Sequence, residues 1–104
     1  MSQFLQIQTT TADAQHAEAI AQTLLHSRLA ACVQVIGPIK SFYRWQGTIE
    51  TSHEWLCVIK TSVAKFAEVE AAIRELHTYE VPEIIALPIA EGSQDYLGWL
   101  RDQL

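Results

Sequence analysis

A short segment of the sequence, residues 77–89, gathers several side chains whose chemistry could serve a binding site: His77, Tyr79, Glu80 and Glu83. Pro82 lies among them; it lacks an amide hydrogen and favours an extended backbone at the residue before it. A helix that leads into this segment therefore has to end near His77 or Thr78, and a buried apolar strand is expected in Ile84–Leu87. The sequence predicts a helix-to-strand junction at which these polar side chains converge.

His77 and Cys32 are the candidate metal ligands. A neutral imidazole nitrogen binds divalent transition metals, and a thiolate binds a soft ion such as Cu(I). One histidine is not a complete site, because structural zinc typically takes four protein ligands and catalytic zinc three. A histidine at a helix C-terminus also interacts favourably with the helix dipole, and free cysteines are common core residues. A structural interpretation is therefore favoured for His77, for Cys32 and, inside an apolar run, for Cys57.

Several further residues are candidates for a cleft between subunits. Lys60 interrupts an apolar run, where it could pair with Glu83, hold an anion at a subunit junction, or simply be solvated at a strand end. Trp45 and Trp99 could line a ligand cleft, but large aromatic side chains more often anchor interfaces, which is the preferred interpretation. Tyr79 and Glu83 are expected to present polar groups into an inter-subunit pocket; the alternative is that they satisfy buried backbone groups at the turn.

Composition excludes several classes of protein. The 104 residues are 49% hydrophobic and 18% charged, as expected for one globular domain spanning residues 1–104. The net charge of −5 disfavours nucleic acid and attracts cations. No stretch approaches the roughly 20 apolar residues that span a bilayer, so membrane insertion is not expected. The absence of a signal-peptide pattern and of a disulfide framework favours a cytoplasmic location.

The elements that would position these residues follow from hydrophobic periodicity and from turn residues. The first half is expected to contain a strand in residues 3–10, a helix through Ala17–Leu25 capped by Thr11 or Asp13, a strand from about Ala31 to Ile36, an extended region Ile39–Trp45 and a turn at Gln46–Gly47. The second half is expected to contain a hairpin arm in Thr48–Ser52, a central strand Trp55–Ile59 and a helix Phe66–Leu76 capped by Ser62. The strand that reaches Pro88 should be an edge strand or become irregular at its end, and a short C-terminal helix capped by Ser93 follows it.

This order is that of an α+β, ferredoxin-like split βαββαβ sandwich with an extended central hairpin and a short C-terminal helix. Three tryptophans and a long hairpin are more apolar surface than a domain of this size easily hides. We therefore expect burial against other copies of the chain. Glycine-rich phosphate loops, G-x-S-x-G elbows and H-E-x-x-H motifs are all missing from the sequence, and no convincing nucleophile and base pair is present, so an enzymatic function is not expected.

The chain resembles the CutA (CutA1-like) family of divalent-cation tolerance proteins. The motifs that carry the resemblance are Arg28-Leu-Ala-Ala-Cys-Val33, Tyr43-Arg-Trp-Gln-Gly47, Ile59-Lys-Thr61, His77-Thr-Tyr-Glu-Val-Pro-Glu-Ile-Ile-Ala-Leu-Pro88 and Asp95-Tyr-Leu-Gly-Trp99, in this order. The resemblance covers almost the whole chain. It implies a ferredoxin-like domain in a compact homotrimer, formed through the hairpin and the sheet edges and similar in architecture to the trimeric PII signalling proteins. Such a trimer would carry a formal charge of −15, three times −5.

The resemblance also implies a role in tolerance of, or response to, divalent metal ions such as copper. No cofactor is certain, and copper or another divalent cation is the candidate. Of the ligand positions proposed in some bacterial members, the helix-end histidine is His77, whereas Leu76 stands where those members have a second histidine and Thr9 where they have a cysteine. The leading hypothesis is a trimeric cytoplasmic protein with weak copper binding near His77. The alternative is a PII-like signalling or scaffolding trimer that holds a small anionic ligand between subunits, near Lys60 and the turn 79–83.

Overall fold

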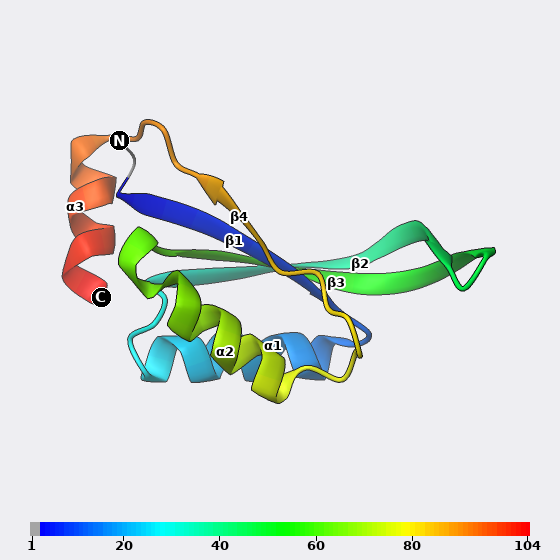
Figure 1. Cartoon of the computed structure of the whole chain (residues 1–104). Coiled ribbons are helices and arrows are strands. Elements are labelled where there is room, and N and C mark those ends of the chain that lie inside the picture. The colour runs from blue at the N-terminus through cyan, green and yellow to red at the C-terminus, as the bar shows by residue number, and fades with distance from the viewer. Residues whose placement is uncertain (1–2) are drawn as a thin grey trace.

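The computed structural model describes residues 3–104, so the first two residues of the predicted domain lie outside the described residues. It confirms the α+β class and the predicted order of elements (Figure 1). The elements are β1 (Phe4–Thr11), α1 (Ala14–His26), β2 (Cys32–Trp45), β3 (Thr48–Ser62), the 3₁₀ helix η1 (Val63–Lys65), α2 (Phe66–Leu76), β4 (Ile85–Pro88) and α3 (Gln94–Gln103). None of the helices in residues 3–104 combines the length and apolar character needed to cross a bilayer.

The four strands form one antiparallel sheet in the order β2-β3-β1-β4. Helices α1 and α2 lie side by side against one face of this sheet, and α3 lies at the end of the sheet away from the hairpin (Figure 1). The order places β4 at an edge, as Pro88 predicts, and β2 at the other edge. Both sheet edges are therefore left with unpaired backbone groups in a single chain.

Two clusters of buried side chains hold the layers together. The larger lies between the sheet and the two helices; it contains Ile7, Ala17, Ile20, Leu24, Ala30, Cys57, Ile59, Val69 and Ile73. Each fully buried large aliphatic side chain contributes about 1.5–3 kcal/mol. The smaller cluster joins Phe4, Ala31 and Leu100. Since Phe4 and Ile7 point to opposite faces of β1 by the period of two, α3 covers one end of the face that α1 and α2 leave open.

The central hairpin extends beyond the helices (Figure 1). The two extended regions predicted on either side of residue 38 are one strand, β2, with an irregularity between Ile36 and Ile39. At its tip, Gln46 (φ 49°) and Gly47 (φ 83°) both have positive φ. A two-residue loop with this geometry matches the twist of the flanking strands, so the Gln-Gly pair explains where the hairpin turns.

Two expectations about these elements are wrong. The segment Ile84–Leu87 is not a buried strand: β4 spans Ile85–Pro88 and all four of its residues are exposed, Ile85 by 47% and Leu87 by 45%. An apolar run favours burial of a strand, but it does not specify which surface would cover the strand. Ser62 does not cap α2; it precedes η1 and makes no side-chain capping bond. The caps at Asp13 and Ser93 are confirmed.

Candidate functional site

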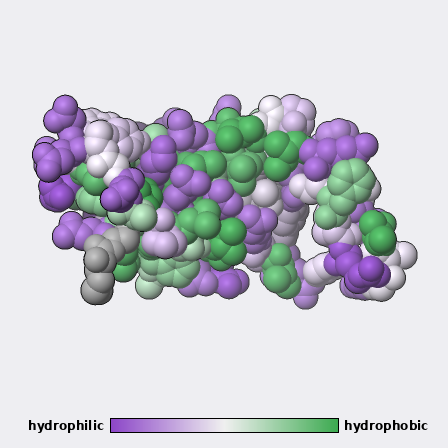
Figure 2. Space-filling model, turned by 90° about the horizontal axis from the view of Figure 1, so that it is seen from above, coloured by the Kyte–Doolittle hydropathy of each residue, from purple (hydrophilic) through white to green (hydrophobic). Residues whose placement is uncertain are grey.

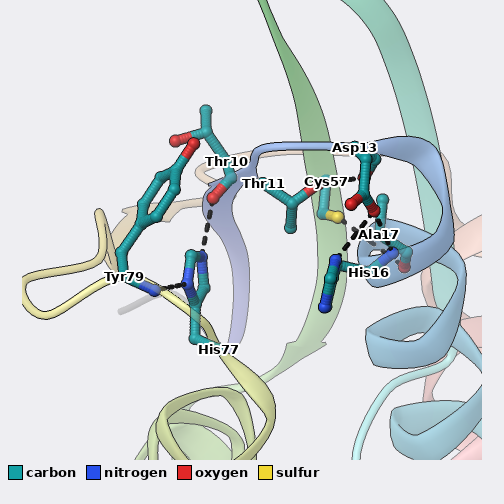
Figure 3. A network of polar contacts seen from close by, with 8 residues as sticks. All are labelled: Thr10, Thr11, Asp13, His16, Ala17, Cys57, His77 and Tyr79. Carbon is teal, nitrogen blue, oxygen red and sulfur yellow. Dashed lines mark hydrogen bonds and ion pairs between the residues drawn. The ribbon is translucent and has the colours of Figure 1, made fainter.

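His77 is a bridge between the end of α2 and the first strand (Figure 3). Its Nε2 lies 2.7 Å from the carbonyl oxygen of Thr10, and the Tyr79 amide donates to its Nδ1 over 3.0 Å. A carbonyl can only accept and an amide can only donate, so Nε2 carries the proton and Nδ1 is the acceptor. Both ring nitrogens are therefore used in holding the segment after α2 against β1.

The same segment carries a buried contact to β3. The Tyr79 hydroxyl donates to Oε2 of Glu54 over 2.8 Å, and Glu54 is only 8% exposed. Burial, together with the hydrogen bond to the Glu54 carboxylate, raises the pKa of Tyr79 well above its usual value. The Tyr79 phenol is therefore protonated at neutral pH and donates to Oε2 of Glu54. The other carboxylate oxygen of Glu54 can still accept a hydrogen bond from another group.

A groove with a volume of about 820 Å³ lies between the hairpin and the turn that follows His77. Its lining residues are Thr10, Ser41, Phe42, Tyr43, Trp45, Glu50, Glu54 and Thr78 to Glu83. Within the described chain the lining contains four glutamates and neither lysine, arginine nor histidine. The junction that the sequence singles out therefore does line a cavity, and that cavity is acidic and aromatic.

Comparison with known proteins places this geometry in a family. A family model described as "CutA1 divalent ion tolerance protein" matches residues 5–103. The chain belongs to the CutA1 family. The divalent-cation tolerance protein CutA of Thermus thermophilus is 46% identical over 86 residues, which are 83% of this chain and 84% of that protein.

Solved structures of other CutA1 proteins superpose closely. The protein named periplasmic divalent cation tolerance protein CutA from Archaeoglobus fulgidus is 40% identical with a TM-score of 0.93, over 96% of this chain and 97% of that one. CutA from Xylella fastidiosa is 37% identical with a TM-score of 0.95, over 98% of both chains. The ferredoxin-like fold expected from the sequence is thus shared with CutA1 structures.

Because the family is described by divalent-ion tolerance, His77 is the position at which a bound metal ion would be expected. The residues around His77 do not form a metal site. Both imidazole nitrogens of His77 are hydrogen-bonded. Thr9 is fully buried with a hydroxyl in place of a thiolate, and Leu76 packs against the larger core cluster. Across residues 3–104, no group of three or more histidine, cysteine, aspartate or glutamate side chains is placed to hold an ion.

The two cysteines lie elsewhere in this CutA1 fold. Half-buried Cys32 pairs with Lys60 at the start of β2, and His77 contacts Thr10, whose strand partner is Leu56. Four residues of β3, about 13 Å, separate those two levels of the sheet. Cys57 is fully buried, and burial raises the pKa of its thiol to about 11. The fold therefore does not bring Cys32 to His77, and it keeps Cys57 protonated.

A second polar cluster seen in Figure 3 has a capping role. Asp13 accepts from the His16 amide over 2.8 Å at the start of α1, and the His16 ring lies 2.8 Å from the same carboxylate oxygen. The backbone hydrogen bond from His16, followed by the side-chain one, lowers the pKa of Asp13. These contacts explain where α1 begins and are separate from the bridge at His77.

The remaining candidates separate into two regions. Trp45, Tyr79 and Glu83 line the groove. Lys60 donates to Gln34 over 3.1 Å and lies 5.6 Å from the centre of the Tyr96 ring, in the region of α3 where exposed Trp99 stacks on Tyr96. Within one chain, Lys60 and Trp99 are therefore not part of the groove, and Lys60 is bonded to Gln34 rather than Glu83.

Glu54 is one of several groove residues that sequence reasoning missed; Tyr43 and Glu50 are others. The signal was available: Glu54 immediately precedes the apolar strand run that begins at Trp55, and a carboxylate next to a run that the chain buries is unusual. Its contact with Tyr79, 25 residues further along, is not visible as a motif.

Proposed function

We propose that the chain acts as a homotrimer in divalent-cation tolerance, with residues 1–104 as one domain. The observation that carries the proposal is the apolar surface on the hairpin, whose strand β2 forms one sheet edge, and on β4, which forms the other. Phe42 and Ile49 on the hairpin are 67% and 68% exposed, and Ile85 and Leu87 on β4 are 47% and 45% exposed. Figure 2, which views the molecule from above, shows apolar patches separated by polar surface, including patches on the projecting hairpin.

The geometry of these edges favours a closed ring. The β2 edge and the β4 edge are different surfaces on opposite sides of one sheet. When one edge of a chain meets the other edge of the next, the contact is heterologous, and such contacts end in a ring if the rotation closes. Closure also removes free edges that would otherwise promote aggregation. A ring of three is the arrangement that the family resemblance implies.

Light scattering on the purified chain tests this assembly. The expected mass is three times 11.7 kDa and holds on dilution. Ile85→Lys, at the β4 edge, is expected to lower that mass, because it places a charge in the contact. Val63→Lys is the matched control, since Val63 is exposed to a similar extent (48%) but lies in η1. A stable monomer, or equal effects of the two substitutions, would refute the role of the edges.

The metal part of the proposal is indirect. Because the residues at His77 do not fit an ion, we propose that the chain contributes to tolerance through its assembly and its partners rather than by holding copper at His77. The cytoplasmic location stays a prediction; cell fractionation of the tagged chain tests it.

The alternative is a PII-like trimer that holds a small anionic ligand between subunits, near Lys60 and the turn 79–83, and the groove lies beside that turn. Its four glutamates oppose an anion at this position. In a thermal-shift screen, anionic metabolites are expected to give no stabilisation that depends on Glu54. An anion that stabilises the chain but not the Lys60→Ala variant would instead support the hypothesis of an anionic ligand.

A further inference from the structure

Glu54 is a buried carboxylate that has no counter-ion among residues 3–104. It is 8% exposed, it receives one hydrogen bond from the neutral Tyr79 hydroxyl, and the ion pairs found in residues 3–104 are His16 with Asp13 and Arg74 with Glu70. A carboxylate taken out of water is costly unless a cation compensates its charge. Since Glu54 lines the groove, a cation that compensates its charge would be bound in the groove.

The walls around Glu54 suit an ammonium group. Tyr43 lies opposite Glu50 in the β2–β3 register, and Glu50 and Glu54 point to the same face of β3 by the period of two. Trp45 follows Tyr43 on that face. Aromatic faces attract cations through their quadrupole, and carboxylates form strong charge-assisted hydrogen bonds with ammonium groups.

The spacing of these carboxylates fits an extended organic cation better than a metal ion. Glu50 and Glu54 are four residues apart in one strand, about 13 Å, and no set of three potential ligands within residues 3–104 is placed to hold a metal. Val81 and Pro82 add apolar wall to the same groove. Carboxylates spread along an apolar groove match a chain of methylene groups that carries charges at intervals.

We infer that the groove binds an extended aliphatic amine with two or more ammonium groups, Glu54 taking one ammonium and Glu50 with Tyr43 another. The net charge of −5 supports capture of such a polycation. Lys40 is not among the lining residues: it pairs with His53 in the hairpin and lies 5.5 Å from the centre of the ring of Phe42, a residue of the groove wall. This inference goes beyond the proposed assembly and needs no metal.

Calorimetric titration of the full chain with spermidine at low ionic strength tests the inference, with n-butylamine and Mg²⁺ as comparison ligands. Spermidine is expected to bind saturably and more tightly than either: n-butylamine has a single ammonium group, and Mg²⁺ has no methylene chain. Glu54→Gln, which keeps an acceptor for Tyr79, is expected to weaken spermidine at least about tenfold. Glu68→Gln removes the same charge from the exposed side of α2 and is expected to change binding by less than about twofold.

A second variant guards against misfolding of Glu54→Gln. Tyr43 is 43% exposed, so Tyr43→Leu is expected to fold as the parent and to weaken spermidine by several-fold through loss of the ring face. The inference is overturned if spermidine gives no saturable heat, if Mg²⁺ matches its affinity, or if the groove variants bind as tightly as Glu68→Gln. Light scattering of the same samples reports the oligomer separately, so a failed assembly and an unoccupied groove give different results.

Discussion

Replacing Thr9 by valine is expected to stabilise the chain, whereas the same replacement at Thr61 is expected to destabilise it. Both side chains are 0% exposed and lie on the neighbouring strands β1 and β3. The Thr61 hydroxyl donates to the Leu29 carbonyl over 2.6 Å, but Oγ1 of Thr9 has no hydrogen-bond partner among residues 3–104. Valine is also β-branched and favours strands, so both substitutions chiefly change the hydroxyl.

The magnitudes follow from these two environments. A buried hydroxyl without a partner costs about 1–3 kcal/mol, so Thr9→Val is expected to raise the free energy of unfolding by about 1–2 kcal/mol. Thr61→Val removes a short hydrogen bond and leaves the Leu29 carbonyl without its donor, so it is expected to lower the same quantity by about 1–3 kcal/mol. The two substitutions make the same chemical change, but they are expected to change the free energy of unfolding in opposite directions.

Equilibrium unfolding in denaturant measures both values. Because assembly makes apparent stability depend on protein concentration, the parent and the two variants are compared at one concentration. A Thr9→Val variant that is destabilised as much as Thr61→Val would mean that Oγ1 of Thr9 has a partner. That result would refute the conclusion that the Thr9 hydroxyl is buried without a hydrogen-bond partner among residues 3–104.

Three further predictions concern the neighbouring elements. Because the fold raises the pKa of Tyr79 by burial and hydrogen bonding, its neutral form contributes stability that is present below its usual value of about 10 and is lost as pH rises above it; denaturant melts between pH 9 and 11 are expected to show a steeper loss for the parent than for Tyr79→Phe. Gly37→Ala is expected to lower the free energy of unfolding by about 1–3 kcal/mol, because its Cβ would clash with the Trp55 ring, whereas Gly98→Ala, in open space on α3, is expected to raise it by about 0.5–1 kcal/mol; thermal unfolding of the two variants checks these signs. His77→Ala is expected to lower stability while leaving the heat of copper titration unchanged, and a saturable copper signal lost in that variant would contradict the bridge.

The sequence predicts the elements of this fold well because their signals are local. Asp13 and Ser93 mark helix starts through their own side chains, and Pro88 marks an edge strand through its missing amide hydrogen. Burial at the junction is not local. Ile85 is as apolar as a core residue, but whether it is covered by its own chain or by another depends on surfaces that a single sequence window does not contain.

The candidate site is predicted in part for the same reason. Residue type and the helix stop identify the segment from His77 to Glu83, and the structure places most of that segment on the groove. The state of His77 depends on the Thr10 carbonyl, 67 residues earlier, and the role of Tyr79 depends on Glu54, 25 residues earlier. Pairings over such distances are decided by sheet register, which the hydrophobic pattern alone leaves open.

The hydrogen bonds of His77 are connected to the groove through Tyr79. This connection changes how the phenotype of a His77 variant has to be interpreted. His77 holds the turn against β1 through Thr10 and fixes the Tyr79 amide, and the Tyr79 hydroxyl in turn orients Glu54 in the groove. A substitution at His77 would therefore displace the Glu54 carboxylate in the groove, although His77 itself does not line the groove. Loss of a cation-dependent response in such a variant does not identify a metal ligand, because the same loss follows from a displaced carboxylate. A substitution of Glu54 changes the groove but leaves the hydrogen bonds of His77 in place. Comparing variants at the two positions therefore distinguishes a residue that contacts the bound cation from one that only positions the groove.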